Sequence, residues 1–370
     1  MLTLFRHAAA ETAWAEPEAF PLPDAGATSC RLATGRSALL HLIRRLPPAC
    51  TQTVLLPCYV AEGVVQPFRE AGFDIAFYRL QPDLRPVVED VARLLQQASG
   101  QAVFVLIHYF GFSACSEELS SVLMQRDAIV VDDLAHAPFT AGANGRLLGE
   151  GAELALYSLN KFLPVVDGAI LLSRHPDIDV TMNEAALPEL PEAAQAAYRE
   201  HLQAAGALAK CQPDEAPPWL QALGETYERY YAVINGDLSA HRQSTASRLM
   251  EAAFPYRLLI ERRQAHARML YEGLNSPTFD LVYPTLPDGV VPFCIPARVP
   301  AERRNEILER LFARGILLST LQDKWDFIPA GGEADFAVEA AFLREHVLIP
   351  VSEFISVDAM GDMTEQLNLI

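Results

Sequence analysis

The sequence lacks several features that would place it in whole classes of protein. No run of eighteen apolar residues occurs, which argues against a membrane-spanning helix, and the N-terminal stretch MLTLFRHAAAETAW has no signal-peptide core. No CxxC spacing occurs either. We therefore expect a cytoplasmic protein with reduced core thiols, and neither a metal site nor a disulfide framework. The cysteines concerned are Cys30, Cys50, Cys58, Cys115, Cys211 and Cys294.

Positive charge is also scarce. The chain has 29 Lys and Arg against 47 Asp and Glu, a net charge of −18, and no Lys/Arg-rich stripe interrupts the acidity. This balance argues against a nucleic-acid partner and against an anionic membrane surface. The plainest interpretation of the acidity is that it keeps a cytoplasmic enzyme in solution. No internal repeat or low-complexity tract is present.

The first half of the chain alternates apolar runs with amphipathic segments. Near-continuous apolar strands separated by helices predict an α/β fold, with a mostly parallel sheet covered on both faces in a three-layer α/β/α arrangement. Ligands of such sheets bind beyond the carboxyl ends of the strands. The expected strands are 53–56, 75–78, 102–107, 128–131, 154–157 and 169–172, and the expected helices are 37–46, 61–71, 87–97 and 117–124.

The rest of the chain predicts an insertion and a second, smaller domain. Residues 176–240 are rich in Ala, Glu and Pro, which favours helices and loops outside the main sheet. A smaller C-terminal α/β domain should follow, so we expect a large domain over 1–245 and a small one over 246–370. Its expected elements are a long helix at 254–274, a strand at 291–295, a helix at 301–314 stopped by Gly315, and a final helix at 336–346.

Lys161 stands in a context that points to covalent cofactor chemistry. An apolar run ending in Asp132-Asp133 precedes it, and Ser158 lies three residues before it at the end of another apolar run. This layout is typical of a site that holds pyridoxal phosphate through a lysine Schiff base. Ser158 is a candidate phosphate ligand, although a helix N-cap would explain it equally well.

The two adjacent aspartates must point to opposite faces of a strand, so only one can reach the cofactor. We choose Asp133, because a carboxylate paired with the pyridine nitrogen keeps the ring cationic and able to accept electrons. His136 would then lie near the ring, unless it is only a half-buried structural histidine.

Three further segments supply weaker candidates for cofactor binding. Gly35-Arg36-Ser37 opens a helix whose free amides and dipole suit a phosphate. Tyr59 and His108 each follow an expected strand at the same sheet edge, where packing in the core is the competing explanation. Arginine suits a carboxylate or diphosphate, so Arg242, Arg248 and Arg257 are candidates near the substrate, or else surface residues. Trp325, in a loop, is a further candidate near the substrate, or else a packing residue.

Together these pieces resemble the DegT/DnrJ/EryC1/StrS family of pyridoxal-phosphate-dependent aminotransferases, which have the fold type I architecture of aspartate aminotransferase. The segments that carry the resemblance are TGRSAL, VLLPCYVAEGVVQPFREAG, HYFGF, IVVDDLAHA, YSLNKFLPVVDGAILL and the later RRQAHARMLYEGL. The resemblance implies that Lys161 is the internal-aldimine lysine, Asp133 the ring-nitrogen partner, and Ser158 with Gly35, Arg36 and Ser37 the phosphate site. It also implies a homodimer with shared active sites, and an amino group moved from glutamate to a keto acceptor such as a keto sugar on a nucleotide.

The sequence departs from the family at several points. Gly35-Arg36-Ser37 replaces the usual Gly-Thr-Ala, the spacing from Ser158 to Lys161 is short, and Asn235-Gly236 is a poor substitute for the family's Asn-Tyr-Arg. Two alternatives therefore stay open beside the aminotransferase: a lyase or decarboxylase that uses the same cofactor, and a non-catalytic cofactor- or partner-binding member of the fold.

Overall fold

The computed structural model describes residues 2, 19–48, 50–98, 100–321 and 324–370. Apart from Leu2, the N-terminal stretch that lacks a signal-peptide core lies outside the described residues. Among the described residues, no helix combines the length and apolar character needed to cross a membrane.

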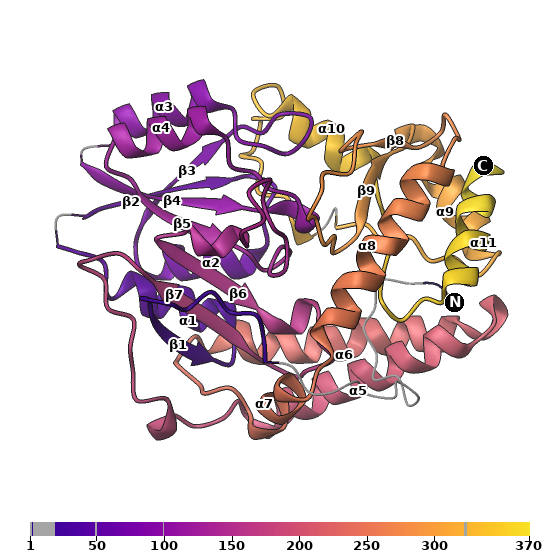
Figure 1. The fold of residues 1–370 in the computed structure, drawn as a ribbon, viewed down its shortest axis with the longest axis horizontal. Helices are drawn as coiled ribbons and strands as arrows, with labels where there is room; N and C mark the ends of the chain where they lie inside the picture. The colour runs from indigo at the N-terminus through magenta and orange to yellow at the C-terminus, as the bar shows by residue number, and fades with distance from the viewer. Residues whose placement is uncertain (1, 3–18, 49, 99, 322–323) are drawn as a thin grey trace.

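A seven-stranded sheet organises the N-terminal part (Figure 1), in the order β1-β7-β6-β5-β4-β2-β3. Strands β2 to β6 pair in parallel, and β7 is antiparallel to both of its neighbours. The strands are β1 (Thr28–Leu32), β2 (Cys50–Pro57), β3 (Asp74–Tyr78), β4 (Gln101–Ile107), β5 (Ile129–Asp133), β6 (Leu154–Ser158) and β7 (Ala169–Ser173).

The predicted strands and helices of this region are confirmed, because apolar runs such as β4 are buried along almost their whole length. The helices are α1 (Gly35–Ile43), α2 (Glu62–Glu70), α3 (Val88–Gln97) and α4 (Glu117–Gln125). Strand β1 was not predicted. Its sequence TSCRL carries polar residues, which an antiparallel strand at the edge of the sheet tolerates.

The segment expected to be an insertion forms two long helices, α5 (Glu192–Lys210) and α6 (Pro217–Gly236). They pack side by side as a helical hairpin, which Figure 1 shows as a separate pair beneath the sheet and the C-terminal part. A short helix, α7 (Thr245–Ala252), follows.

A second, smaller sheet forms the C-terminal part, with the antiparallel order β10-β9-β8. Its strands are β8 (Asp280–Leu281), β9 (Ile295–Arg298) and β10 (His346–Ile349), and its helices are α8 (Tyr256–Gly273), α9 (Arg304–Phe312), α10 (Ala337–Glu345) and α11 (Val357–Asn368). The α/β fold with a mostly parallel sheet and a smaller C-terminal α/β unit is confirmed.

Two details of the C-terminal prediction were wrong. The strand expected at 291–295 begins only at Ile295, because the preceding residues bond to the large sheet's loops: Phe293 N donates to Phe110 O at 2.8 Å. The helix at 336–346 is not the last one, since α11 follows it. Gly315 does end its helix, with a φ of +81°.

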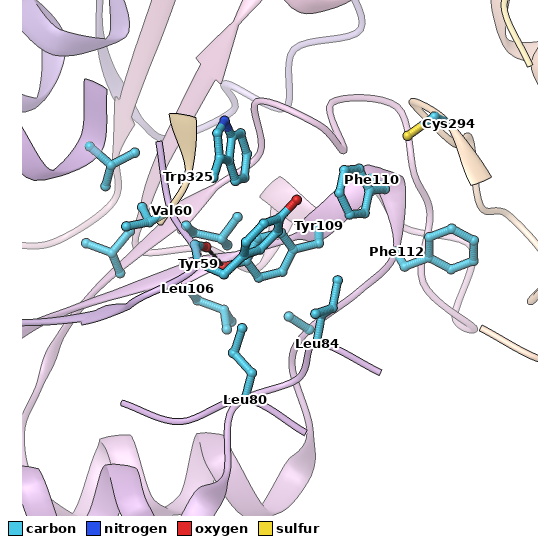
Figure 2. Packing of buried hydrophobic residues seen from close by; sticks show 14 of the residues in the cluster. Tyr59, Val60, Leu80, Leu84, Leu106, Tyr109, Phe110, Phe112, Cys294 and Trp325 are labelled. Atoms are coloured by element: carbon cyan, nitrogen blue, oxygen red, sulfur yellow. Dashed lines mark hydrogen bonds between the residues drawn. The ribbon is translucent and has the colours of Figure 1, made fainter. Parts of the chain in front are cut away.

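The core between the two parts is aromatic (Figure 2). Tyr59 is fully buried, and its ring centroid lies 5.5 Å from that of Tyr109 and 5.2 Å from that of Trp325. Of the six cysteines, Cys30, Cys58 and Cys294 are buried, Cys50 and Cys211 are half-buried, and Cys115 is exposed. The core-thiol prediction therefore holds for three of them and is wrong for Cys115.

Candidate active site

The two aspartates at the end of β5 point in different directions. Asp132 is half-buried, and its Oδ1 lies 2.8 Å from Nε2 of His108. The Ala114 amide donates to the other ring nitrogen of His108, so Nε2 carries the proton and donates to Asp132. Asp133 is buried on the opposite face, where it lines a cavity of about 390 Å³. The strand alternation thus separates the two carboxylates as predicted.

Burial makes Asp133 electrostatically unusual. Removal from water raises the pKa of this carboxyl, against the opposing effects of the Ala135 amide and the positive charge of Lys161. Its Oδ1 accepts a hydrogen bond of 2.9 Å from Ala135 N. A cationic partner inside the cavity would stabilise its ionised form.

Lys161 lies at the end of a short 3₁₀ turn, Leu159–Lys161, directly after β6. The turn is fixed by its neighbours, since Leu159 N donates to Gly168 O at 2.9 Å and Gly168 N donates to Ala33 O at 2.8 Å. These bonds join the lysine segment to the turn before α1. Lys161 and Ser158 both line the cavity, and Ser158 Oγ donates to Asn160 Oδ1 at 3.0 Å.

Helix α1 presents its N-terminus to the same cavity. Thr34 is the N-cap, because its Oγ1 accepts from Ser37 N at 3.2 Å and lies 2.6 Å from Ser37 Oγ. Thr34, Gly35 and Arg36 line the cavity, whereas the hydroxyl of Ser37 serves the cap. The predicted Gly-x-Ser turn is therefore present, with Thr34 as an additional polar member.

His136 lies in a stack of rings at the cavity wall. Its ring is parallel to that of Phe293, with centroids 4.6 Å apart and an interplanar angle of 1°, and it stacks on Trp325 at 5.4 Å. Trp325 thus packs and lines the cavity at once. Tyr59 and His108 do not line the cavity: Tyr59 belongs to the aromatic core and His108 to the Asp132 pair.

The α5–α6 hairpin closes one side of the cavity. Tyr227, Tyr230, Tyr231 and Asn235 of α6 line it. The hairpin is held in place because Tyr230 and Ile234 pack with Ala33 and Val166, the neighbours of the phosphate turn and of the lysine segment. The insertion therefore covers the site within one chain. Sequence reasoning missed the tyrosines, although Tyr227, Tyr230, Tyr231 and Ile234 show the spacing of a single helix face.

The loop 324–327 completes the rim, and the predicted arginines do not take part. Lys324, Trp325, Asp326 and Phe327 line the cavity. Arg242 pairs with Glu189 at 2.8 Å and Arg248 with Glu184 at 3.8 Å. Neither of these arginines, nor Arg257, is among the lining residues.

Solved structures of aminotransferases share this fold. TlmJ from Streptoalloteichus hindustanus, an aminotransferase, superposes with a TM-score of 0.67 at 17% identity, covering 100% of this chain and 98% of its own. Helicobacter pylori PseC, an aminotransferase involved in the biosynthesis of pseudoaminic acid, gives 0.63 at 15% identity over 92% and 85% of the two chains. A DegT DnrJ EryC1 StrS aminotransferase from Brucella abortus gives 0.62 at 14% identity over 92% and 84%. No family model and no curated relative matches the sequence. At these identities the likeness establishes the fold, and it agrees with the resemblance carried by the sequence motifs.

Proposed function

We propose that this protein is a pyridoxal-phosphate-dependent aminotransferase of the DegT/DnrJ/EryC1/StrS family, which moves an amino group from an amino acid, glutamate in the first instance, to a keto acceptor. One observation carries the proposal. Lys161, Asp133 and the N-terminus of α1 come from three separate segments and converge on one cavity, beyond the carboxyl ends of parallel strands.

The residues present fit the cofactor. Asp133 is a buried carboxylate whose raised pKa reflects burial, and a protonated pyridine nitrogen is the kind of cation that would offset this cost. The amides of α1 and the Arg36 guanidinium suit a phosphate, and Nε of Arg36 is buried without a hydrogen-bond partner among the described residues. His136 lines the same cavity, where its ring stacks on those of Phe293 and Trp325.

Each side chain then has a definite task. Lys161 would hold the aldehyde of the cofactor, and its amine, once released by the incoming amino acid, would carry the proton at the substrate α-carbon. Asp133 would keep the ring nitrogen protonated, and Ser158 with Thr34, Gly35 and Arg36 would hold the phosphate. When bound, the cofactor supplies an electron sink for the bond broken at the α-carbon.

The class of keto acceptor is a separate part of the proposal. DesI, a solved structure that superposes on this chain with a TM-score of 0.62 at 15% identity, was analysed in the presence of its TDP-sugar product. This supports a keto sugar on a nucleotide as the acceptor class for this chain. Homodimer formation and a cytoplasmic location remain predictions.

The test begins with cofactor loading. The purified protein is incubated with pyridoxal phosphate, its visible spectrum is recorded, and the complex is reduced with borohydride and peptide-mapped. We expect a mass increment on Lys161 that the Lys161→Ala variant lacks. A folded protein that loads no cofactor would reject the proposal in favour of a non-catalytic binding protein.

Reaction type is decided next, by adding glutamate without an acceptor. An aminotransferase releases about one equivalent of 2-oxoglutarate per loaded site and then stops, because the amino group stays on the enzyme. A decarboxylase instead releases carbon dioxide continuously. A single equivalent of 2-oxoglutarate supports the aminotransferase, and continuous release of carbon dioxide supports the decarboxylase.

A further inference from the structure

Four side chains form a row along the hairpin side of the cavity, with a cation at each end and two tyrosine rings between them. Nζ of Lys324 lies 3.7 Å from the ring centroid of Tyr227, whose centroid lies 4.1 Å from that of Tyr231. The Cζ atom of Arg36 lies 5.0 Å from the Tyr231 centroid. All four residues line the cavity, and we call them the cation–ring row.

Among the described residues, the two cations of the row form no ion pair. In the part of the chain that the structure describes, neither Arg36 nor Lys324 has a carboxylate within 4.0 Å. The acidic residues of the rim are otherwise engaged: Glu62 binds Arg69 at 3.0 Å, and Asp326 Oδ1 accepts from Ile328 N at 3.1 Å. In a protein of net charge −18 such free positive charge is unexpected.

The small number of lysines in the chain also draws attention to Lys324. The chain contains three lysines in 370 residues, Lys161, Lys210 and Lys324. Two of the three line this one cavity. Lys161 has the chemical task argued above, which leaves Lys324 as a second cavity lysine that the reaction itself does not require.

Contacts with α2 also hold the cation–ring row in position. A Cβ at Gly63 would lie 3.0 Å from Cζ of Arg36, so the guanidinium is confined between the backbone of α2 and the Tyr231 ring. Gln66 Nε2 donates to Asn235 O at 2.7 Å and thereby ties α2 to α6. A ring face stabilises a cation without consuming its hydrogen-bond donors, so the contacts with Tyr227 and Tyr231 leave those donors able to bind a ligand.

We propose that the cation–ring row binds an oxyanion of the substrate, a carboxylate or a phosphate, with Lys324 as the residue that selects for it. The proposal rests on the proposed function for the identity of the reaction. Arg36 belongs to the phosphate turn and forms the cofactor end of the row. Lys324 comes from the loop 324–327 of the C-terminal part, lines the same cavity at the other end of the row, and is therefore the cation left for the substrate. Charge-assisted hydrogen bonds of this kind are short and strong, and removal of one partner weakens binding measurably.

Two unreactive probes test the proposal and separate the two sources of oxyanion. Glutarate carries carboxylates without an amine, and pyrophosphate carries phosphate oxygens without a sugar. Binding is followed through the fluorescence of Trp325, the neighbour of Lys324, in protein previously incubated with pyridoxal phosphate. The neutral diamide of glutarate serves as the uncharged reference.

Three lysine variants give the comparison. We expect Lys324→Met to weaken the preferred probe by about 10- to 100-fold, the cost of one charged hydrogen bond. Lys324→Arg should retain most of the affinity, and Lys210→Met on the exposed end of α5 should leave it unchanged. Tyr227→Leu should weaken binding where Tyr227→Phe does not, since only the former removes the ring face. Circular dichroism on each variant verifies the fold.

The outcomes are distinct. Glutarate as the preferred probe indicates a substrate carboxylate, and pyrophosphate indicates a substrate phosphate. Equal affinity of wild type and Lys324→Met for both anions, or binding of the diamide as tight as that of the preferred anion, overturns the proposal. Cofactor loading on Lys161 is measured on the same samples by mass, so a failure of the enzyme assignment is recognised separately from a failure of the anion site.

Discussion

The amide of Leu321 donates a hydrogen bond of 2.9 Å to Nε2 of His346. The other ring nitrogen, Nδ1, donates to Phe342 O at 2.8 Å, so the imidazole is neutral and both of its nitrogens are engaged. Through this bond a fully buried histidine of β10 anchors the start of the loop that carries Lys324 and Trp325. Protonation of Nε2 would break the anchor.

Acid should therefore lower the free energy of unfolding through the protonation of His346. Burial lowers the pKa of His346 from 6.5 to about 4. A depressed histidine pKa means that its stabilising contribution is complete above about pH 6.5 and is lost as pH falls from there toward 4. We expect on the order of 2–3 kcal/mol to be lost by pH 4 from this group. Urea unfolding at pH 7.5, 5.5 and 4.5 measures the change.

The matched variant is His346→Gln, whose amide oxygen still accepts from Leu321 but does not titrate. Its stability should fall less steeply with acid than that of the wild type. Burial also lowers the pKa values of His41 and His266, so some slope remains. Identical pH profiles for the variant and the wild type would show that His346 is not the sensor.

Asp133→Asn should stabilise the cofactor-free protein. Because burial raises the pKa of Asp133, its stability contribution is present below its ordinary pKa of about 4 and is lost as pH rises through the folded value. At pH 7–8 the asparagine avoids the buried charge, so its Tm without cofactor should equal or exceed that of the wild type, and the difference should vanish near pH 4. Thermal unfolding with and without pyridoxal phosphate measures both states.

The same variant should lose function. Asparagine does not pair with a ring cation as a carboxylate does, so the gain in Tm on adding cofactor should be smaller and glutamate turnover should fall by about 100- to 1,000-fold. Wild-type turnover in Asp133→Asn would remove Asp133 from the catalytic set.

Tyr231→Leu should weaken cofactor binding through Arg36. The Arg36 guanidinium lies over the ring of Tyr231, 5.0 Å from its centroid. Loss of a partly desolvated cation–π contact costs about 1–2 kcal/mol, or roughly 5- to 30-fold in the Kd of pyridoxal phosphate. Tyr231→Phe retains the ring face and should bind as the wild type does. Equilibrium dialysis with the two variants side by side decides whether the ring or the hydroxyl matters.

Gly111→Ala should destabilise the junction between the two parts of the fold. Gly111 has a φ of +103°, and a Cβ there would lie 2.6 Å from Val291 O. The matched control is Gly145→Ala, with a φ of +74° and no atom within 4 Å of the added Cβ. We expect about 1 kcal/mol for the backbone cost alone at Gly145 and about 2–4 kcal/mol at Gly111, where a clash is added. Equal losses in urea unfolding would contradict the steric argument.

Local patterns in the sequence predicted the large sheet well. The parallel strands contain continuous apolar runs, and the helices between them carry a helical period, so both signals can be read from the sequence alone. The pattern failed where tertiary contacts override it. The polar edge strand β1 forms because β7 lies beside it. Residues 291–294 do not belong to β9, because Phe293 N donates to Phe110 O and Val291 N donates to Thr140 Oγ1.

The candidate site divides in the same way. Lys161, Asp133, His136 and Ser158 were predicted from short motifs at strand ends, because the fold of a parallel sheet brings strand ends together. The turn Gly35-Arg36-Ser37 was predicted from its place at the start of a helix, and of its three residues Gly35 and Arg36 line the cavity. Whether Tyr59 and His108 point into the cavity depends on side-chain packing, and the structure turns them away into the aromatic core and the Asp132 pair. Their role as cofactor ligands stays a prediction.

The sequence by itself determined the order of the strands along the chain, the strand ends at which polar residues stand, and the alternation that separates Asp132 from Asp133. These are properties of neighbours within one segment. Only the tertiary structure decided that α6 folds back over Lys161 and that Lys324, more than 160 residues downstream, shares a cavity with it. Such contacts are set by the packing of whole elements against one another, and no spacing within a segment encodes them.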